Sequence, residues 1–139
     1  MQFDHEKLDV YKLTLQCVAW ATPLIAEVRE QHGKLVGEVC DHLDRASLSV
    51  LFNTAEGNGK RQRQVRAKFF DDARGSATEC AACLDALVAK ATCPEQRVQA
   101  GKEMLLRIVS MLTKLVAKFE EPDELREEGP EYRTGDSPT

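Results

Sequence analysis

Apolar residues recur along this chain every three or four positions, which is the spacing produced by one face of an α-helix. This period continues through four long segments, and in none of them does a strand pattern compete with it. The segments are separated by residues that commonly end or begin helices: Gly33, then Gly57 and Gly59, and finally Pro94. The pattern therefore predicts an all-α protein with four helices.

The first helix, expected from about Leu8, carries two apolar stripes instead of one, and Pro23 should bend it without ending it. The narrower stripe has the spacing of a bundle seam and consists of Leu8, Tyr11, Leu15, Val18, Thr22 and Ile25. The second stripe runs beside it and consists of Leu13, Cys17, Trp20, Leu24 and Val28. One intramolecular core rarely needs both stripes. We therefore expect the narrower stripe to face the core and the second to lie at the interface of a homo-oligomer.

Each of the other three helices has one apolar seam, and Gly57 is expected to adopt the left-handed conformation that ends the second helix. The three seams are Val36, Val39, Leu43, Ala46 and Val50; then Phe69, Ala73, Ser76, Cys80, Leu84, Leu87 and Ala91; then Val98, Leu105, Ile108, Leu112, Leu115 and Phe119. Because the connections are only a few residues long, consecutive helices must reverse direction. This predicts an antiparallel up-down-up-down four-helix bundle.

The periodicity stops after Phe119, which divides the 139 residues into a bundle domain, 1–119, and a tail, 120–139. The tail holds eight acids and two arginines, and its prolines and glycines with so few apolar residues predict disorder. Its net charge is −6, so the body carries +2. A body so close to neutral does not bind nucleic acid over its whole surface, and any basic behaviour must be local.

The five cysteines are scattered through the apolar patterns, which is not the spacing of a secreted disulfide framework. We expect reduced, mostly buried thiols. No apolar run approaches the length of a membrane span, and the first residues lack the basic and apolar parts of a signal peptide. The sequence therefore predicts a soluble, cytoplasmic protein without a membrane partner.

The start of the third helix is the most basic part of the chain. Its cations are Lys60, Arg61, Arg63, Arg66 and Lys68. The helix macrodipole favours acids at this position, so electrostatics within that helix do not account for them. If exposed, they would form a positive surface able to contact the phosphates of RNA or DNA. The alternative is a solvated face of ion pairs, with Arg61 or Arg63 bound to Glu56 and other cations bound to a neighbouring subunit.

Two polar residues of the second helix, Asn53 and Glu56, invite a chemical interpretation. Glu56 lies near a helix C-terminus, where a carboxylate is disfavoured by roughly 0.3–1 kcal/mol, so we expect a salt bridge to Lys60, Arg61 or Arg45. Asn53 could bind a ligand, but a polar residue on a bundle seam more often fixes helix register through hydrogen bonds. An enzyme using both residues at a subunit cleft would need an activated partner group that the sequence does not offer.

No other motif points to catalysis. The stretch from Gly57 to Lys60 lacks the spacing, the hydroxyl residue and the preceding strand of a phosphate loop. Cys80 and Cys83 form a C-x-x-C pair in mid-helix, without a second pair at zinc-finger spacing. Glu38 and His42 could meet across one helical turn, but the Glu-x-x-His motifs of a di-iron bundle are absent. We expect no catalytic residue, no metal site, no cofactor and no enzymatic activity.

Short motifs in the first three helices occur in a characteristic order. They are Lys7-Leu8-Asp9-Val10-Tyr11; Arg45-Ala46, Ser49, Asn53, Ala55-Glu56-Gly57 and Gly59-Lys60; and Ala73, Gly75-Ser76 and Glu79. Together they resemble the four-helix bundle family of 23S rRNA intervening-sequence proteins, whose relatives include the accessory variability protein of diversity-generating retroelements. Leu51 and Asp44 depart from the family pattern, in which a proline and a second arginine are common.

The resemblance implies a pentameric ring of five bundles and, in the retroelement branch, a basic surface that binds nucleic acid and a reverse transcriptase. The residues Arg45, Ser49, Asn53, Glu56, Gly57 and Gly59 would then belong to a structural motif. We predict a non-enzymatic homo-oligomer that binds RNA or DNA through the basic cluster at the start of the third helix, alone or together with a protein partner. The alternative is a structural or protein-interaction ring that binds no nucleic acid.

Overall fold

The structure, a computed structural model, describes residues 2–121 and confirms the predicted all-α fold with four long helices. The elements are η1 (Asp4–Lys7), α1 (Asp9–His32), η2 (Gly33–Leu35), α2 (Gly37–Gly59), α3 (Arg63–Ala89) and α4 (Glu95–Glu120). None of the described helices is both long and apolar enough to cross a membrane. The predicted disordered acidic tail lies, from residue 122 onward, outside the described residues.

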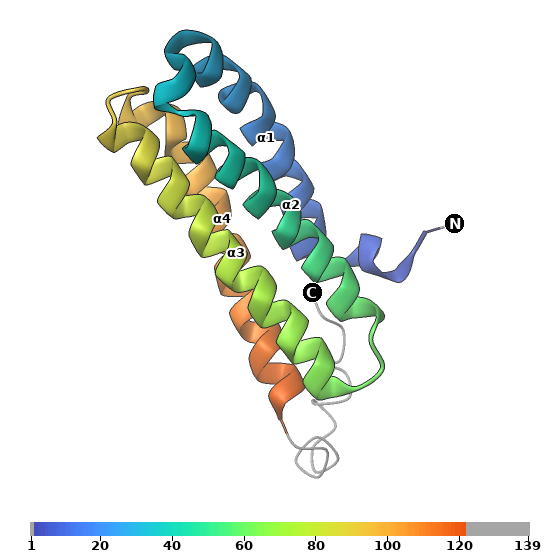
Figure 1. Cartoon of the computed structure of the whole chain (residues 1–139). Coiled ribbons are helices and arrows are strands. Elements are labelled where there is room, and N and C mark those ends of the chain that lie inside the picture. Colours follow the sequence, from blue (N-terminus) through green and yellow to red (C-terminus); the bar gives the residue numbers. More distant parts are fainter. Residues whose placement is uncertain (1, 122–139) are drawn as a thin grey trace.

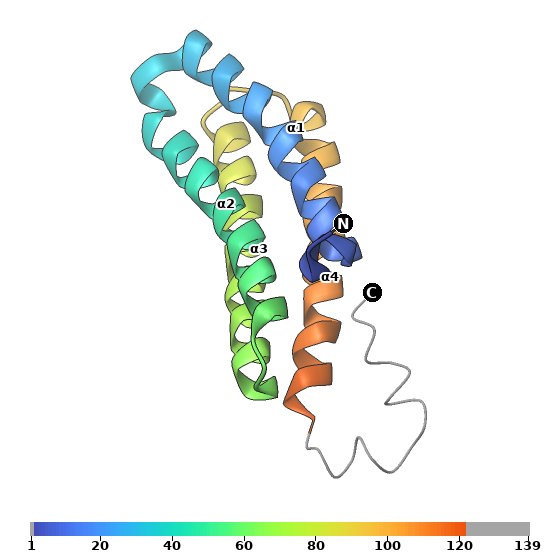
Figure 2. The same cartoon turned by 90° about the vertical axis from the view of Figure 1, so that its right-hand side faces the viewer.

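The four helices lie side by side, and each runs in the direction opposite to the one before it (Figure 1). Within the described chain, α1 and α3 each contact both α2 and α4, whereas no close contacts join α1 to α3 or α2 to α4. The helices therefore follow one another around the bundle in chain order, and Figure 2 shows the same arrangement from the side.

The second stripe of α1 faces the core, contrary to the expectation, and the narrower stripe is buried only at its two ends. Four members of the second stripe are buried within this single chain: Leu13, Cys17, Leu24 and Val28. Its fifth member, Trp20, packs half-buried against the same core. In the narrower stripe Leu8 and Ile25 are buried, Tyr11 and Val18 are half-buried, and Leu15, at 44%, and Thr22 are exposed.

The prediction that the second stripe forms an oligomer interface is therefore wrong. The other helices of the same chain already cover it. Val10, Thr14 and Ala21 are buried beside it and widen the buried face. A face of that width is what a helix packed against two neighbours must bury.

The seams predicted for the other helices form the rest of the core. Every predicted position of α4 is buried, and in α2 only Val39 is less than fully buried. In α3, Phe70 is fully buried, whereas Phe69 is half-buried. Ala91, the last predicted seam position, is exposed beyond the end of the helix.

Backbone conformation explains two helix ends. α1 ends at Gly33, whose φ of 53° confirms the predicted break. α3 ends with Ala91 at a φ of 60°, after which the Thr92 N–H donates to the Leu87 carbonyl, as in a Schellman motif. Pro23 lies inside α1 without ending it, as expected.

Gly57 does not end α2, contrary to the prediction, and the helix continues to Gly59. Gly57 is buried where α2 meets α3, and a Cβ atom there would lie 3.0 Å from the ring of Phe70. The absence of a side chain thus serves close helix packing instead of a left-handed turn.

Trp20 joins α1 to α4. A Cβ atom on Gly101 of α4 would lie only 2.2 Å from the indole ring, so the glycine provides the surface on which the ring rests. Arg97, one turn earlier on α4, lies 5.8 Å from the indole and forms a 3.1 Å ion pair with Glu27 of α1. Trp20 is thus part of the fold of one chain, and its replacement would disturb the bundle before any assembly.

We expect Gly101→Ala to destabilise the protein by about 1–3 kcal/mol, because the new methyl group must displace the Trp20 ring. Gly75→Ala is the matched control, since a Cβ atom at that helical position meets nothing within 4 Å. The control should gain about 0.5–1 kcal/mol from helix propensity. Urea unfolding measures both changes, and equal effects of the two substitutions would contradict the close packing at Gly101.

Candidate nucleic-acid interface

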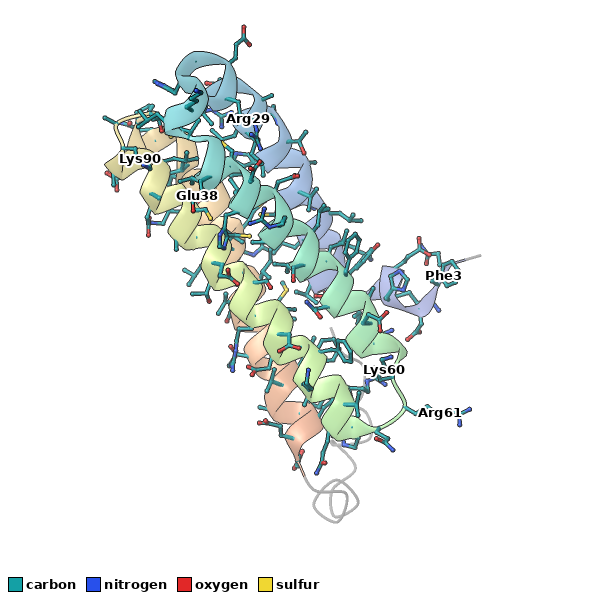
Figure 3. All side chains as sticks on the ribbon, in the orientation of Figure 1. Phe3, Arg29, Glu38, Lys60, Arg61 and Lys90 are labelled. Carbon is teal, nitrogen blue, oxygen red and sulfur yellow. The ribbon has the colours of Figure 1, made fainter. Side chains whose placement is uncertain are left out.

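The predicted basic cluster lies at one end of the bundle, where α2 passes into α3. Lys60 follows the last residue of α2, Arg61 lies in the connecting loop, and the remaining three cations occupy the first two turns of α3. Figure 3 labels Lys60 and Arg61 at this end and Lys90 at the opposite end of the molecule. The cluster does not act as one exposed surface, because its members point in different directions.

Arg63 and Arg66 turn toward the C-terminal end of α4. Their guanidinium carbons lie 4.8 and 4.4 Å from the centre of the Phe119 ring, and Arg63 also donates a hydrogen bond to the main-chain carbonyl of Lys118. The antiparallel arrangement brings the negative end of the α4 macrodipole to these cations. The electrostatic reason for the arginines thus lies in a neighbouring helix, which reasoning about their own helix did not reveal.

Arg66 also belongs to a hydrogen-bond chain that fixes η1 to the bundle. Its Nη2 donates to Oδ1 of Asn58 at 3.0 Å, and Asn58 Nδ2 donates to Oδ2 of Asp4 at 2.9 Å. Asn58 is buried near the end of α2. Sequence reasoning assigned no role to Asn58 or Asp4, and no local pattern links residues so distant along the chain.

Lys60 and Lys68 remain at the surface and flank one aromatic ring. Their ammonium nitrogens lie 5.2 and 5.4 Å from the centre of the half-buried Phe69 ring. Lys60 pairs with Glu56 at 3.2 Å, and Lys68 pairs with Asp72 at 3.1 Å. Both pairs join exposed side chains one helical turn apart, and such pairs contribute only about 0.2–1 kcal/mol. The predicted salt bridge from Glu56 is confirmed, with Lys60 as its partner.

Arg61 is the most outward member of the cluster. Its side chain extends from the loop away from the helices (Figure 3). Within residues 2–121 it forms none of the hydrogen bonds or ion pairs found for its neighbours. The expected pairing of Arg61 or Arg63 with Glu56 does not occur.

The polar motif of α2 forms contacts across the α2–α3 seam. Asn53 Nδ2 donates to both the main-chain carbonyl and the hydroxyl of Ser49, each at 3.0 Å, and the Ser49 hydroxyl lies 2.9 Å from that of Ser76. Farther along the seam, His42 Nε2 lies 2.7 Å from Oε2 of Glu79. Asn53 thus bonds within α2, to Ser49 one turn earlier, and it is Ser49 and His42 that reach across to α3.

Arg45 is exposed beside this seam. It lines a shallow groove of about 240 Å³ together with His42, Ser49, Ser76 and Glu79. The salt bridge expected between Glu56 and Arg45 as one of three possible partners does not form, because Glu56 pairs with Lys60.

Residues 6–114 match the family model of the 23S rRNA-intervening sequence proteins. The chain belongs to this family. The comparison with curated proteins found no match. The region matched to the 23S rRNA-intervening sequence proteins includes the whole α2 motif and the basic cluster, but it ends before Lys118 and Phe119, which hold Arg63 and Arg66 in this chain.

Four of the five cysteines of this 23S rRNA-intervening sequence protein are buried, and none forms a disulfide among the described residues. Burial raises the pKa of Cys17 to about 11, and burial together with the nearby Cys17, Cys83 and Glu79 raises the pKa of Cys80 to about 12. The pKa of Cys83 is also raised, mainly by burial. A redox-active C-x-x-C pair needs the opposite shift, because its attacking group is a thiolate.

These shifts predict a loss of stability at alkaline pH. A thiol whose pKa is higher in the folded chain stays protonated there while the unfolded chain ionises, so its stabilising effect is complete below about pH 9 and falls as pH rises toward 11 to 12. Each such thiol should cost about 1 kcal/mol between pH 9 and 10.

Urea unfolding of the reduced protein across this range measures the effect, and Cys80→Ala should flatten the decline relative to wild type. The same lysines and tyrosines titrate in both proteins, so the difference reports the thiol. Parallel curves would show that Cys80 does not ionise on unfolding.

Proposed function

We propose that this protein is a non-enzymatic, homo-oligomeric helical bundle that binds RNA or DNA at the end where α2 meets α3. The observation that carries the proposal is the outward position of Arg61, with the exposed Lys60 and Lys68 close by. Phosphates are bound by cations that can leave their solvent shell or their weak pairs at small cost. These three residues meet that condition.

The proposed contact set is smaller than the basic run in the sequence. Arg63 and Arg66 hold the end of α4 through Phe119, and moving them onto a phosphate would give up those contacts. The carboxylates of Glu56 and Asp72 contribute little where they meet the two lysines, because both pairs are exposed. A phosphate could therefore replace them without disturbing the helices.

The roles of Asn53 and Glu56 support a binding function over catalysis. Asn53 is engaged with Ser49, and Glu56 pairs with Lys60 at the surface. Within residues 2–121, the partners of Asn53 and Glu56 are Ser49 and Lys60, and neither partner is placed as a base that would activate them. The proposal therefore assigns them to the architecture of α2 and requires no cofactor.

We expect Arg61→Glu to weaken the binding of a labelled RNA or DNA about tenfold or more at about 50 mM salt, and to lower the salt dependence of affinity. Lys90→Glu makes the same charge change at the opposite end of the bundle and should have a small effect. Fluorescence anisotropy measures both variants. Equal losses would mean that net charge matters and that the α2–α3 end is not the binding surface.

A second candidate function is that of a protein-interaction scaffold that assembles without nucleic acid. It is favoured by the narrower stripe of α1, which remains partly uncovered in the single chain, with Leu15 at 44% exposure. In this candidate the apolar surface between subunits would be that of Tyr11, Leu15 and Val18. The pentamer implied by the resemblance remains part of the proposal.

If this stripe lies between subunits, Leu15→Glu should reduce the particle mass measured by light scattering, because a carboxylate would be buried against apolar groups. Leu35→Glu is the matched control, since Leu35 is 53% exposed and lies at the end of the bundle with η2. Unchanged mass for Leu15→Glu would remove this face from the interface.

A further inference from the structure

Beside the basic end of the bundle lies an open groove of about 490 Å³ that the fold does not fill. It is bounded by η1 on one side and by the last turns of α2 on the other. Its lining residues are His5, Phe52, Ala55, Glu56, Gly59 and Lys60. The groove therefore contains a cation of the proposed phosphate-binding surface and opens next to Arg61.

Two aromatic side chains, Phe52 and His5, line the groove. Phe52, on the outer side of α2, is 59% exposed and does not belong to the apolar core. On the opposite side the groove is lined by His5, and the 74% exposed Phe3 stacks on this imidazole, with ring centres 5.7 Å apart and nearly parallel planes. His5 in turn meets the edge of Tyr11 at 4.7 Å. Single exposed apolar residues are common, but here aromatic side chains line both sides of one groove.

The charges beside the groove complement a phosphate chain. Lys60 lies at its edge, and Arg61 follows it directly in the chain and points outward (Figure 3). Glu56 is the one acid that lines the groove, and its carboxylate is paired with Lys60 at 3.2 Å. A carboxylate in this position can also accept a hydrogen bond from the amino group of a base.

We propose that this groove binds an unpaired nucleic-acid strand, with a base stacked on Phe52 and adjacent phosphates held by Lys60 and Arg61. This inference rests on the proposed function and specifies its substrate as single-stranded. In a duplex the faces of the bases are covered by their neighbours, so an aromatic side chain cannot stack on them. In an unpaired strand the faces are free, and aromatic residues beside a basic surface are the usual means of binding them.

The test uses fluorescence anisotropy of the full chain with a labelled strand of about 12 nucleotides, prepared as RNA and as DNA, single-stranded and as a duplex of the same sequence. Wild type should prefer the single strand. Phe52→Ala should weaken single-strand binding about 5- to 100-fold and leave duplex binding unchanged, whereas Phe52→Tyr, which keeps a ring for stacking, should bind like wild type.

Leu106→Ala is the matched control, because it truncates an exposed apolar side chain on a different helix, α4. It should not change affinity, and circular dichroism should show that all variants remain folded. If Arg61→Glu weakens binding while Phe52→Ala does not, or if the duplex binds as tightly as the single strand, the stacking site is refuted and the proposed function stands. If wild type binds neither form at about 50 mM salt, both proposals are refuted.

Discussion

Phe119, near the C-terminus of α4, lies against the guanidinium groups of Arg63 and Arg66 and 5.8 Å from the ring of Phe70. This contact joins the beginning of α3 to the end of α4 and brings two cations to the negative end of a helix macrodipole. It also leaves those cations half-buried. The more exposed cations of this segment are Lys60, Arg61 and Lys68, so the packing of α4 decides which of its charges face solvent.

Much of the fold could be predicted because its determinants repeat along each helix. The α4 seam has one unambiguous stripe, and every predicted position is buried. α1 could not be resolved in the same way, because both of its stripes have helical spacing and periodicity does not reveal which one faces the other helices. The pairing of Trp20 with Gly101 depends on which helices are neighbours and at what height they meet. Neither residue indicates that by itself.

In the candidate site, too, contacts between residues close in the sequence could be predicted, whereas contacts between distant residues could not. The pair of Glu56 with Lys60 spans one helical turn and was predictable from spacing and from the helix end. The contacts of Arg63 and Arg66 with Phe119 join residues more than fifty positions apart. The sequence showed that the arginines are charged, but not that their side chains turn toward α4. The groove between η1 and α2 was not foreseen, because its two sides meet only through tertiary structure. Its one signal in the sequence is Phe52, an aromatic residue outside the apolar seam of α2.

The polar contacts between α2 and α3 relate this surface to the rest of the bundle. The Ser49 and Ser76 hydroxyls lie 2.9 Å apart, and the His42 to Glu79 contact is 2.7 Å, so both restrict how one helix can slide along the other. A slip of one turn would move α2 by about 5.4 Å. It would separate Gly57 from Phe70 and carry Lys60 away from the ring it shares with Lys68. These polar pairs contribute little stability as exposed or half-buried contacts, but by fixing the register they determine where the cations and the groove lie.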